Sequence, residues 1–186
     1  MHIIDLIDDA ILIEQVAMLL IEGFQESWND MESALEEVRE SLKPESISRI
    51  AVSGDRTVLG WIGGHGAYHG HVWELHPLVV HTAYQGQGIG RQLVADFEDR
   101  VRERGGITIY LGTDDEDNRT SLGGVDVYPN MLDRIAGIKN LRRHPYEFYQ
   151  KLGYSIVGII PDANGFGKPD ICMAKRVQSP EEKKNE

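Results

Sequence analysis

A length of 186 residues suits one domain with a single sizeable core, and 30 acidic against 19 basic residues give a net charge of -11. This charge argues against nucleic acids and anionic membranes as partners and favours a cationic small molecule. The single cysteine, Cys172, excludes an internal disulfide and suits a reducing compartment. No apolar run reaches the roughly 18 residues of a membrane-spanning helix, and the acidic N-terminus does not resemble a signal peptide. We therefore expect a soluble, cytoplasmic protein.

The N-terminal part of the chain shows strand and helix patterns in alternation. Asp8 or Asp9 is placed to cap a helix with one apolar face, and Pro44 ends a second, acidic helix. Gly54-Asp55 predicts a hairpin turn between two strands. The elements expected here are a strand at 2–6, a helix to about residue 23, a helix at about 31–43, and strands at 47–53, 57–63 and 72–80.

The stretch WELHPLVVHTAYQGQGIGR, residues 73–91, joins an apolar strand to an amphipathic helix through a glycine-rich turn. Glycines let the backbone approach a ligand, and the N-terminus of the helix adds N–H groups and a positive dipole end. We therefore predict that a phosphate-bearing ligand binds here. A G-x-x-x-x-G-K-S/T loop and a full G-x-G-x-x-G are both absent, so neither a P-loop nor a dinucleotide fold is indicated.

The rest of the chain reads as strands around one irregular segment. Expected are a buried strand at 107–111 followed by GTDDEDNRT, a short helix near 130–138, a helix opened by His144-Pro145, and strands at 154–160 and 170–177. The order suggests a mixed α/β sheet covered by helices. We predict one domain over residues 1–177 and a charged, frayed tail at 178–186.

Several of these segments resemble one enzyme family. WELHPLVV, YQGQGIG, YLGTDDED, HPYEFYQKLGY and VGIIPDANGFGKPDI are similar to aminoglycoside 6'-N-acetyltransferases of the GNAT superfamily, whose pyrophosphate loop reads Q-x-x-G-x-G. The resemblance implies an α/β (α+β) GNAT fold, with a mixed, mostly antiparallel central sheet flanked by helices and a strand bulge near Pro77-Leu78. It also implies acetyl transfer from acetyl-CoA to the 6'-amine of an aminoglycoside, with a role in antibiotic resistance, by a metal-free homodimer.

Three side chains are candidates for proton transfer. Glu74 ends a buried strand and is the candidate base, directly or through a water, although it could instead be satisfied by a neighbouring arginine. His76 falls on the same strand face and is either a proton relay or a core histidine. Tyr149, by the family resemblance, faces the thioester sulfur and would protonate the leaving thiolate; otherwise it packs in the core, as we expect of Tyr146.

Two groups of residues are candidates for binding. Because Pro77 lacks an N–H, the strand ladder must break beside it and leave backbone groups for the pantetheine arm and the acetyl carbonyl. The cofactor-binding candidates are Leu78, Val79, Val80, Gln85, Gly86, Gln87, Gly88, Ile89, Gly90, Arg91 and Tyr149. The acceptor-binding candidates are Trp28, Tyr68, Glu74, Asp114, Asp115 and Asp170, with a plain solvated loop as the alternative for the acidic run.

Other chemistries fit the sequence less well. His65, His69 and His71 lie close together, but no cysteine or well-spaced carboxylate completes a metal-ligand set. Cys172 has no evident base nearby, so we read it as a strand residue and not a nucleophile. Two other functions stay open: acetylation of a polyamine or protein amine, and non-catalytic sensing of acetyl-CoA.

Overall fold

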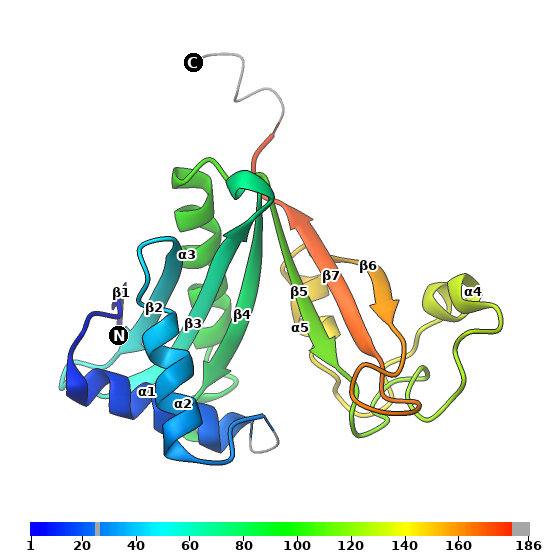
Figure 1. Cartoon of the computed structure of the whole chain (residues 1–186), viewed down its shortest axis with the longest axis horizontal. Coiled ribbons are helices and arrows are strands. Elements are labelled where there is room, and N and C mark those ends of the chain that lie inside the picture. The colour runs from blue at the N-terminus through cyan, green and yellow to red at the C-terminus, as the bar shows by residue number, and fades with distance from the viewer. Residues whose placement is uncertain (25–26, 180–186) are drawn as a thin grey trace. The chain divides into compact units, whose positions relative to one another are not determined.

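The computed structural model describes residues 1–24 and 27–179. The chain forms two compact units: unit 1 comprises Met1–Ile109 and the segment from Val177 onward, and unit 2 comprises Tyr110–Arg176. Figure 1 labels the elements. They are β1 (His2–Asp5), α1 (Ala10–Gly23), α2 (Met31–Glu40), β2 (Ser46–Val52), β3 (Val58–Ala67), η1 (Tyr68–Gly70), β4 (Val72–Val80), η2 (Thr82–Tyr84), α3 (Ile89–Glu103), β5 (Thr108–Asp114), α4 (Met131–Ala136), α5 (Tyr146–Lys151), β6 (Ser155–Ile160) and β7 (Asp170–Arg176).

The strands follow the order β1-β2-β3-β4-β5-β7-β6. The pairs β1/β2, β2/β3, β3/β4 and β6/β7 are antiparallel. The predicted fold class, a mostly antiparallel sheet flanked by helices, is confirmed. The single domain over residues 1–177 stays a prediction.

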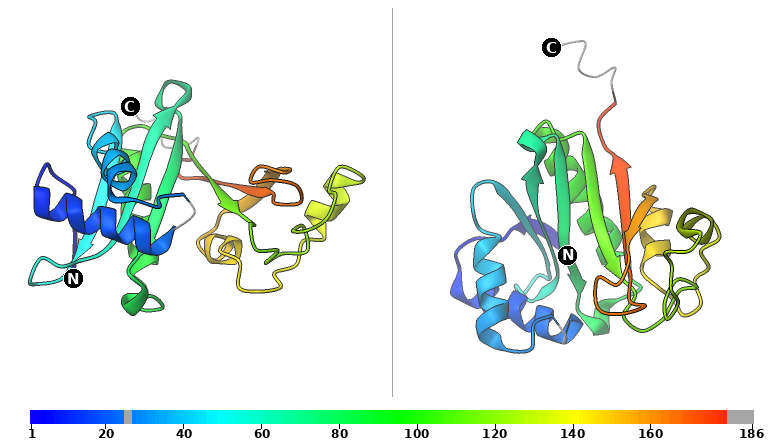
Figure 2. Two further views of the ribbon diagram at one scale, coloured as in Figure 1. Left: turned by 60° about the horizontal axis from the view of Figure 1, so that its bottom comes forward. Right: turned by 45° about the vertical axis from the view of Figure 1, so that its right-hand side comes forward.

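Unit 1 is layered, with α1 and α2 on one face of β1–β4 and α3 on the other (Figures 1 and 2). Glycine positions identify the faces. A Cβ on Gly60 would meet Leu93 of α3, whereas a Cβ on Gly23 at the end of α1 would meet Val79 of β4. Asp9 caps α1 by accepting from the N–H groups of Ile11 and Leu12, as the sequence predicts.

The core on the α1 and α2 side is almost entirely apolar. A polar group within it is the indole of Trp61, which donates from Nε1 to Ser48 Oγ over 2.9 Å. A satisfied indole leaves the rest of this layer free to pack by apolar contact alone. The fully or nearly fully buried members include Leu12, Ile13, Val16, Leu20, Ala34, Val38, Ile50, Val52, Trp61 and Val79.

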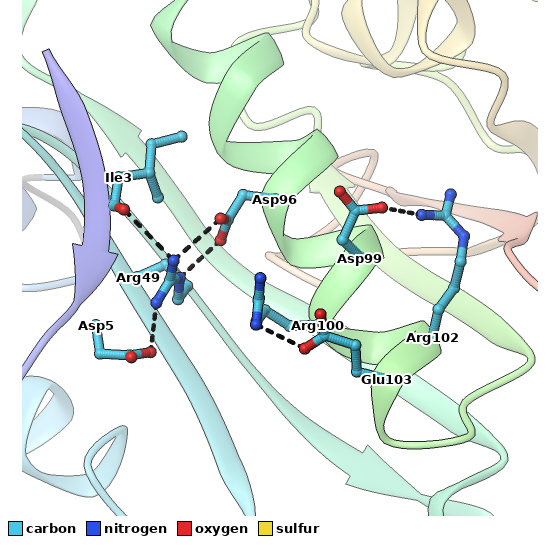
Figure 3. A network of polar contacts seen from close by, with 8 residues as sticks. All are labelled: Ile3, Asp5, Arg49, Asp96, Asp99, Arg100, Arg102 and Glu103. Carbon is cyan, nitrogen blue, oxygen red and sulfur yellow. Dashed lines mark hydrogen bonds and ion pairs between the residues drawn. The ribbon is translucent and has the colours of Figure 1, made fainter.

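The opposite face of the sheet holds an ionic tie. Arg49 of β2 donates to both carboxylate oxygens of Asp96 on α3, from Nε over 2.7 Å and from Nη2 over 3.0 Å. Its Nη1 lies 2.5 Å from Asp5 of β1 (Figure 3). Burial lowers the pKa of Arg49, but hydrogen bonds and charge from the two carboxylates raise it further. The net pKa is raised, so the guanidinium stays charged. One side chain thus joins β1, β2 and α3.

Further along α3, the surface ion pairs are local. Arg102 pairs with Asp99 and Arg100 pairs with Glu103 within the helix (Figure 3). Pairs of this exposure and spacing add only a few tenths of a kcal/mol each. The position of α3 on the sheet therefore depends on its apolar face and on Arg49.

Unit 2 is built around a buried carboxylate. Asp115, which follows β5, has no exposed surface. Its oxygens accept from Arg119 N at 2.5 Å, Thr120 N at 2.9 Å and Thr120 Oγ1 at 2.7 Å. These bonds fold the chain after β5 back on itself before it continues to α4 and α5. The antiparallel β6 and β7 complete the unit.

Most element boundaries fall within a few residues of those predicted. The helix at 31–43 is shorter, because the chain leaves α2 after Glu40 and Ser41 Oγ donates to Val38 O over 2.6 Å. The strand at 57–63 continues to Ala67, and the strand at 107–111 continues to Asp114. Residues 25 and 26 of the FQESWND segment, and 180–186 of the predicted tail, lie outside the described residues.

Candidate active site

The glycine-rich turn between β4 and α3 has the backbone geometry that an anion cradle needs. Gly86 and Gly88 have φ values of 75° and 85°, in the left-handed region that other residues avoid, and a Cβ at either position would meet no atom within 4 Å. The backbone is thus open to a ligand from this side. Gln85 Nε2 donates to Val80 O over 3.0 Å and holds the turn against the end of β4.

The first turn of α3 differs from those of the other long helices. Asp9 and Asp30 cap α1 and α2 with side-chain oxygens. Gly88, the N-cap of α3, provides no such bond within the described part of the chain, and the first turn carries no acidic residue. The N–H groups at the start of a helix need acceptors, so this end is prepared for an anion from outside.

A bulge interrupts the pairing of β3 and β4. Ile62 pairs with Leu78 and Gly64 pairs with Leu75, so His76 and Pro77 together lie opposite Gly63. A Cβ on Gly63 would come within 2.9 Å of His76 O. The bulge predicted near Pro77-Leu78 is therefore present and is centred on the His76–Pro77 pair, where Pro77 has no N–H for the ladder.

Glu74 and His76 lie on the face of β4 away from α3. Glu74 is opposite His65 in register, and its Oε2 lies 3.4 Å from His65 Nε2. Glu74 thus lies beside a histidine of the neighbouring strand. His76 is exposed and lies beside Trp28, with 5.9 Å between the ring centroids. The structure therefore brings together three predicted residues, Trp28, His76 and Glu74, on one face of unit 1.

Tyr68 is the first residue of the connection between β3 and β4. It belongs to η1, its φ is 49°, and it is 75 % exposed. His69 and His71 follow it, and His65 lies on β3, three residues before η1. Across residues 1–24 and 27–179, no group of three His, Cys, Asp or Glu side chains is arranged to hold a metal ion.

Tyr149 lies on the inner face of α5. Its ring contacts Phe148 and Tyr154 edge to face, with centroid distances of 5.0 and 5.7 Å. Burial raises the pKa of Tyr149 well above the ordinary 10.0, so the hydroxyl keeps its proton at any physiological pH. It has the protonation state that an acid for a leaving thiolate needs. Tyr146, one turn earlier, is buried as expected.

The acidic run after β5 divides into residues with different surroundings. Asp114 ends the strand, is exposed, and accepts from Asn164 Nδ2 over 2.5 Å. Asp115 is enclosed and accepts three hydrogen bonds from its own loop. A fully enclosed, hydrogen-bonded carboxylate holds the loop together. Asp115 is therefore a structural residue of the loop, and Asp114 is the one of the two that is exposed to solvent. The plain solvated loop offered as the alternative does not describe Asp115.

Asp170, at the start of β7, lies against β5 within unit 2. A Cβ added to Gly112 would collide with both oxygens of its carboxylate. The absence of a side chain at Gly112 therefore makes room for the Asp170 carboxylate. The sequence gives no cue for this pairing, since residues 112 and 170 are far apart in the chain. Cys172, two residues further on, is half-buried, and burial raises the pKa of its thiol, which keeps it a poor nucleophile.

Two residues of this region were missed by sequence reasoning. His144 is buried, its Nε2 lies 3.0 Å from Asp114 O, and it exchanges two hydrogen bonds with Asn140. Burial lowers the pKa of His144, so the neutral ring ties the start of α5 to the end of β5. Asn164 is the second, since it anchors the PDANG loop to Asp114. His-Pro before a helix and Asn-Gly in a loop were read only as boundaries.

Comparison with known proteins identifies the class. A family model described as "Acetyltransferase (GNAT) family" matches residues 13–123. The chain belongs to the GNAT family of acetyltransferases. A comparison with curated proteins finds no match. No helix within the described residues is long and apolar enough to cross a membrane.

Solved structures give closer likenesses. An aminoglycoside 6'-N-acetyltransferase complexed with coenzyme A is 47 % identical, with a TM-score of 0.92 over 96 % of this chain and 98 % of that one. The aminoglycoside 6'-N-acetyltransferase from Enterococcus faecium is also 47 % identical, with a TM-score of 0.89 and the same coverage, 96 % and 98 %. An aminoglycoside 6'-acetyltransferase type Ii is 40 % identical, with a TM-score of 0.75 over 96 % and 99 %.

Proposed function

We propose that the chain transfers the acetyl group of acetyl-CoA directly to the 6'-amine of aminoglycosides. The observation that carries this proposal is the identity of 40–47 %, over 96 % of the chain, to three structures of aminoglycoside 6'-acetyltransferases. The site supports it independently. The uncapped start of α3 and the open turn at Gly86 and Gly88 suit the pyrophosphate of coenzyme A.

The cofactor candidates have separate roles in this proposal. The turn and first helical residues, from Gln85 to Arg91, bind the pyrophosphate through backbone N–H groups. Backbone groups near Leu78, Val79 and Val80, beyond the bulge, bind the pantetheine arm and polarise the acetyl carbonyl. A preorganised N–H aimed at the developing oxyanion is worth about 10²–10³ in rate in other acyl transfers.

Proton transfer is assigned to three side chains. Glu74 takes a proton from the substrate ammonium, directly or through a water, so that the neutral amine attacks the thioester. His76 relays that proton or holds the water. Tyr149 protonates the departing thiolate, a role that follows from the family resemblance and suits the raised pKa of its buried hydroxyl.

The acceptor is recognised by charge and by aromatic surface. Asp114 and Asp170 supply carboxylates, Asp115 supports the loop that carries Asp114, and Trp28 and Tyr68 supply aromatic rings. Aminoglycosides are polycations at neutral pH, which suits a chain with a net charge of -11. We also propose that the enzyme is a cytoplasmic homodimer and that its acetylation of aminoglycosides confers resistance.

The test is an acceptor panel with wild-type protein and acetyl-CoA. It comprises kanamycin, tobramycin, spermidine and a lysine-bearing peptide, with the product mass and the position of acetylation measured. We expect one acetyl group on the 6'-amine of the aminoglycosides. Faster turnover of spermidine or the peptide would overturn the proposed substrate class. Tight binding of acetyl-CoA without transfer to any amine would instead identify a sensor.

A further inference from the structure

A cavity of unit 2 lies between two of its loops, residues 124–128 and 162–167. Its volume is about 500 Å³, within the usual size of small-molecule pockets. Among the residues that the structure describes, its lining includes two carboxylates and two aromatic rings and no lysine or arginine. The lining residues are Gly124, Val125, Asp126, Tyr128, Asp162, Phe166 and Gly167.

The two rings are unusually open to solvent. Phe166 is 100 % exposed and Tyr128 is 64 % exposed. The two loops that carry them are joined, since Gly124 N donates to Gly167 O over 2.8 Å. Bare rings beside a cavity provide flat surfaces for the C–H faces of a sugar and for ammonium groups.

The carboxylates are held in fixed orientations. Asp162 Oδ1 accepts from Gly167 N over 2.7 Å, and Asp126 Oδ1 accepts from Tyr128 N over 3.1 Å. Each bond closes a turn within its own loop and keeps the negative charge at the pocket wall. A wall of this charge disfavours an apolar partner and favours an organic cation.

One loop of the pocket also holds a residue already assigned to the acceptor. Asn164, in the same loop as Asp162 and Phe166, donates to Asp114 Oδ1 over 2.5 Å. The PDANG loop therefore links the strand end that carries Asp114 to the pocket wall. Asp114 and the pocket wall are thus joined through a single short loop.

We propose that this pocket binds an ammonium-bearing ring of the aminoglycoside other than the one that is acetylated, and so selects acceptors with several rings. The inference rests on the proposed function. Asp126 and Asp162 pair with the ammonium groups of that ring, and Phe166 and Tyr128 pack on its face. The site thus determines specificity and has no part in the chemical step.

The test uses Asp126→Asn, Asp162→Asn, the double variant and Phe166→Ala. Asparagine keeps an oxygen that can accept the Gly167 or Tyr128 N–H, so the loops are preserved while the charges are removed. Asp133→Asn, at an exposed position on α4 outside the pocket lining, is the matched control. Each protein is titrated calorimetrically with tobramycin, and KM is measured for tobramycin and for the one-ring acceptor 6-amino-6-deoxyglucose.

We expect each pocket variant to weaken tobramycin about three- to fivefold in both Kd and KM, and the double variant about tenfold, as partly exposed charge pairs do. KM for the one-ring acceptor and for acetyl-CoA should not change, and Asp133→Asn should behave as wild type. Equal tobramycin affinity in wild type and double variant would overturn the pocket proposal while leaving the function intact. If wild type binds tobramycin but acetylates none of the panel, the proposed function fails, and the calorimetric comparison still decides the pocket.

Discussion

At the scale of single residues, the candidate carboxylates occupy three different environments. Glu74 is half-buried in a strand beside His65, Asp114 is exposed at a strand end, and Asp115 is enclosed with three hydrogen bonds. Only the first combines partial burial with partial exposure of its carboxylate, and this environment suits the general base that we propose. Environment, more than residue type, assigns their roles.

Replacing Glu74 by glutamine should lower kcat/KM for an aminoglycoside by about 10²-fold, the usual contribution of a positioned base. The loss should be largest at the acid end of the pH profile, where the substrate amine is protonated and must be deprotonated. Steady-state kinetics from pH 6 to 9 measure this. Glu36→Gln, at an exposed position on α2, is the control. An unchanged profile would reduce Glu74 to a structural partner of His65.

Tyr149→Phe removes one hydroxyl and keeps both ring contacts, so we expect a lower kcat with an unchanged acetyl-CoA affinity. It also has a consequence for stability at alkaline pH. Because burial raises the pKa of Tyr149 above 10.0, the unfolded chain loses this proton first as the pH rises. The wild-type protein should therefore lose part of its stability above about pH 10, and the variant should lose less.

Urea unfolding of both proteins at pH 9 and pH 11 measures that difference. Tyr84→Phe, at a partly exposed ring, should leave the alkaline loss as in wild type. A kcat equal to wild type in Tyr149→Phe would assign the proton to another donor. An equal alkaline loss in the two proteins would mean that the hydroxyl is more open than its burial indicates.

At the scale of elements, the sequence predicted strands and helices best where periodicity and boundary residues agree. The strand at 72–80 has the expected bounds, and the amphipathic helix expected after the glycine-rich turn is present as α3. The end of β3 was missed because GGHG reads as a turn. The strand continues through Gly64 to Ala67, and the missing side chains of Gly63 and Gly64 make room for His76 O and the ring of Phe97.

The candidate site was predictable where a local sequence motif determines the backbone. A local motif such as Q-x-x-G-x-G encodes its own backbone shape, so the turn and the uncapped helix were predictable. Asp115 and His144 were not, because their roles depend on burial and on partners that a linear pattern does not encode. DDED cannot show which of its carboxylates is enclosed.

The turn before α3 gives a prediction at this scale. Gly88→Val should weaken acetyl-CoA binding by at least about tenfold, since a branched side chain disfavours φ near 85° and would stand where the pyrophosphate approaches. Gly105→Val is the matched control, because Gly105 has a similar φ of 75° and equally open surroundings at the other end of α3. Calorimetry should show tight binding in the control. Equal weakening in both variants would attribute the effect to backbone strain.

At the scale of the whole molecule, the net charge of -11 acts on both substrates with opposite sign. It attracts a polycationic aminoglycoside and repels the phosphates of acetyl-CoA, and added salt screens both effects beyond about 8 Å at 0.15 M. Charge therefore makes the two affinities respond differently to ionic strength.

Raising NaCl from 0.05 to 0.5 M should increase KM for tobramycin several-fold and leave KM for acetyl-CoA unchanged or lower. Initial rates at saturating partner substrate measure both constants. A series with equal osmolality of sucrose controls for solvent effects. A parallel rise in both constants would show that salt acts on the enzyme in general and not on acceptor recognition.

The bulge in β4 determines which face of the sheet each later side chain of the strand occupies. Side chains alternate along a strand, but two residues opposite Gly63 shift that alternation, so Glu74 and Val79 share one face although they are five positions apart. Regular pairing of the same residues, without the bulge, would turn one half of the strand over and move either the Glu74 carboxylate or Val79 to the α3 side. We therefore expect a homologous strand with one residue fewer between positions 74 and 79 to lack the bulge, and one of the same length to keep it. In this strand, the number of residues is as much a part of the site as their identity.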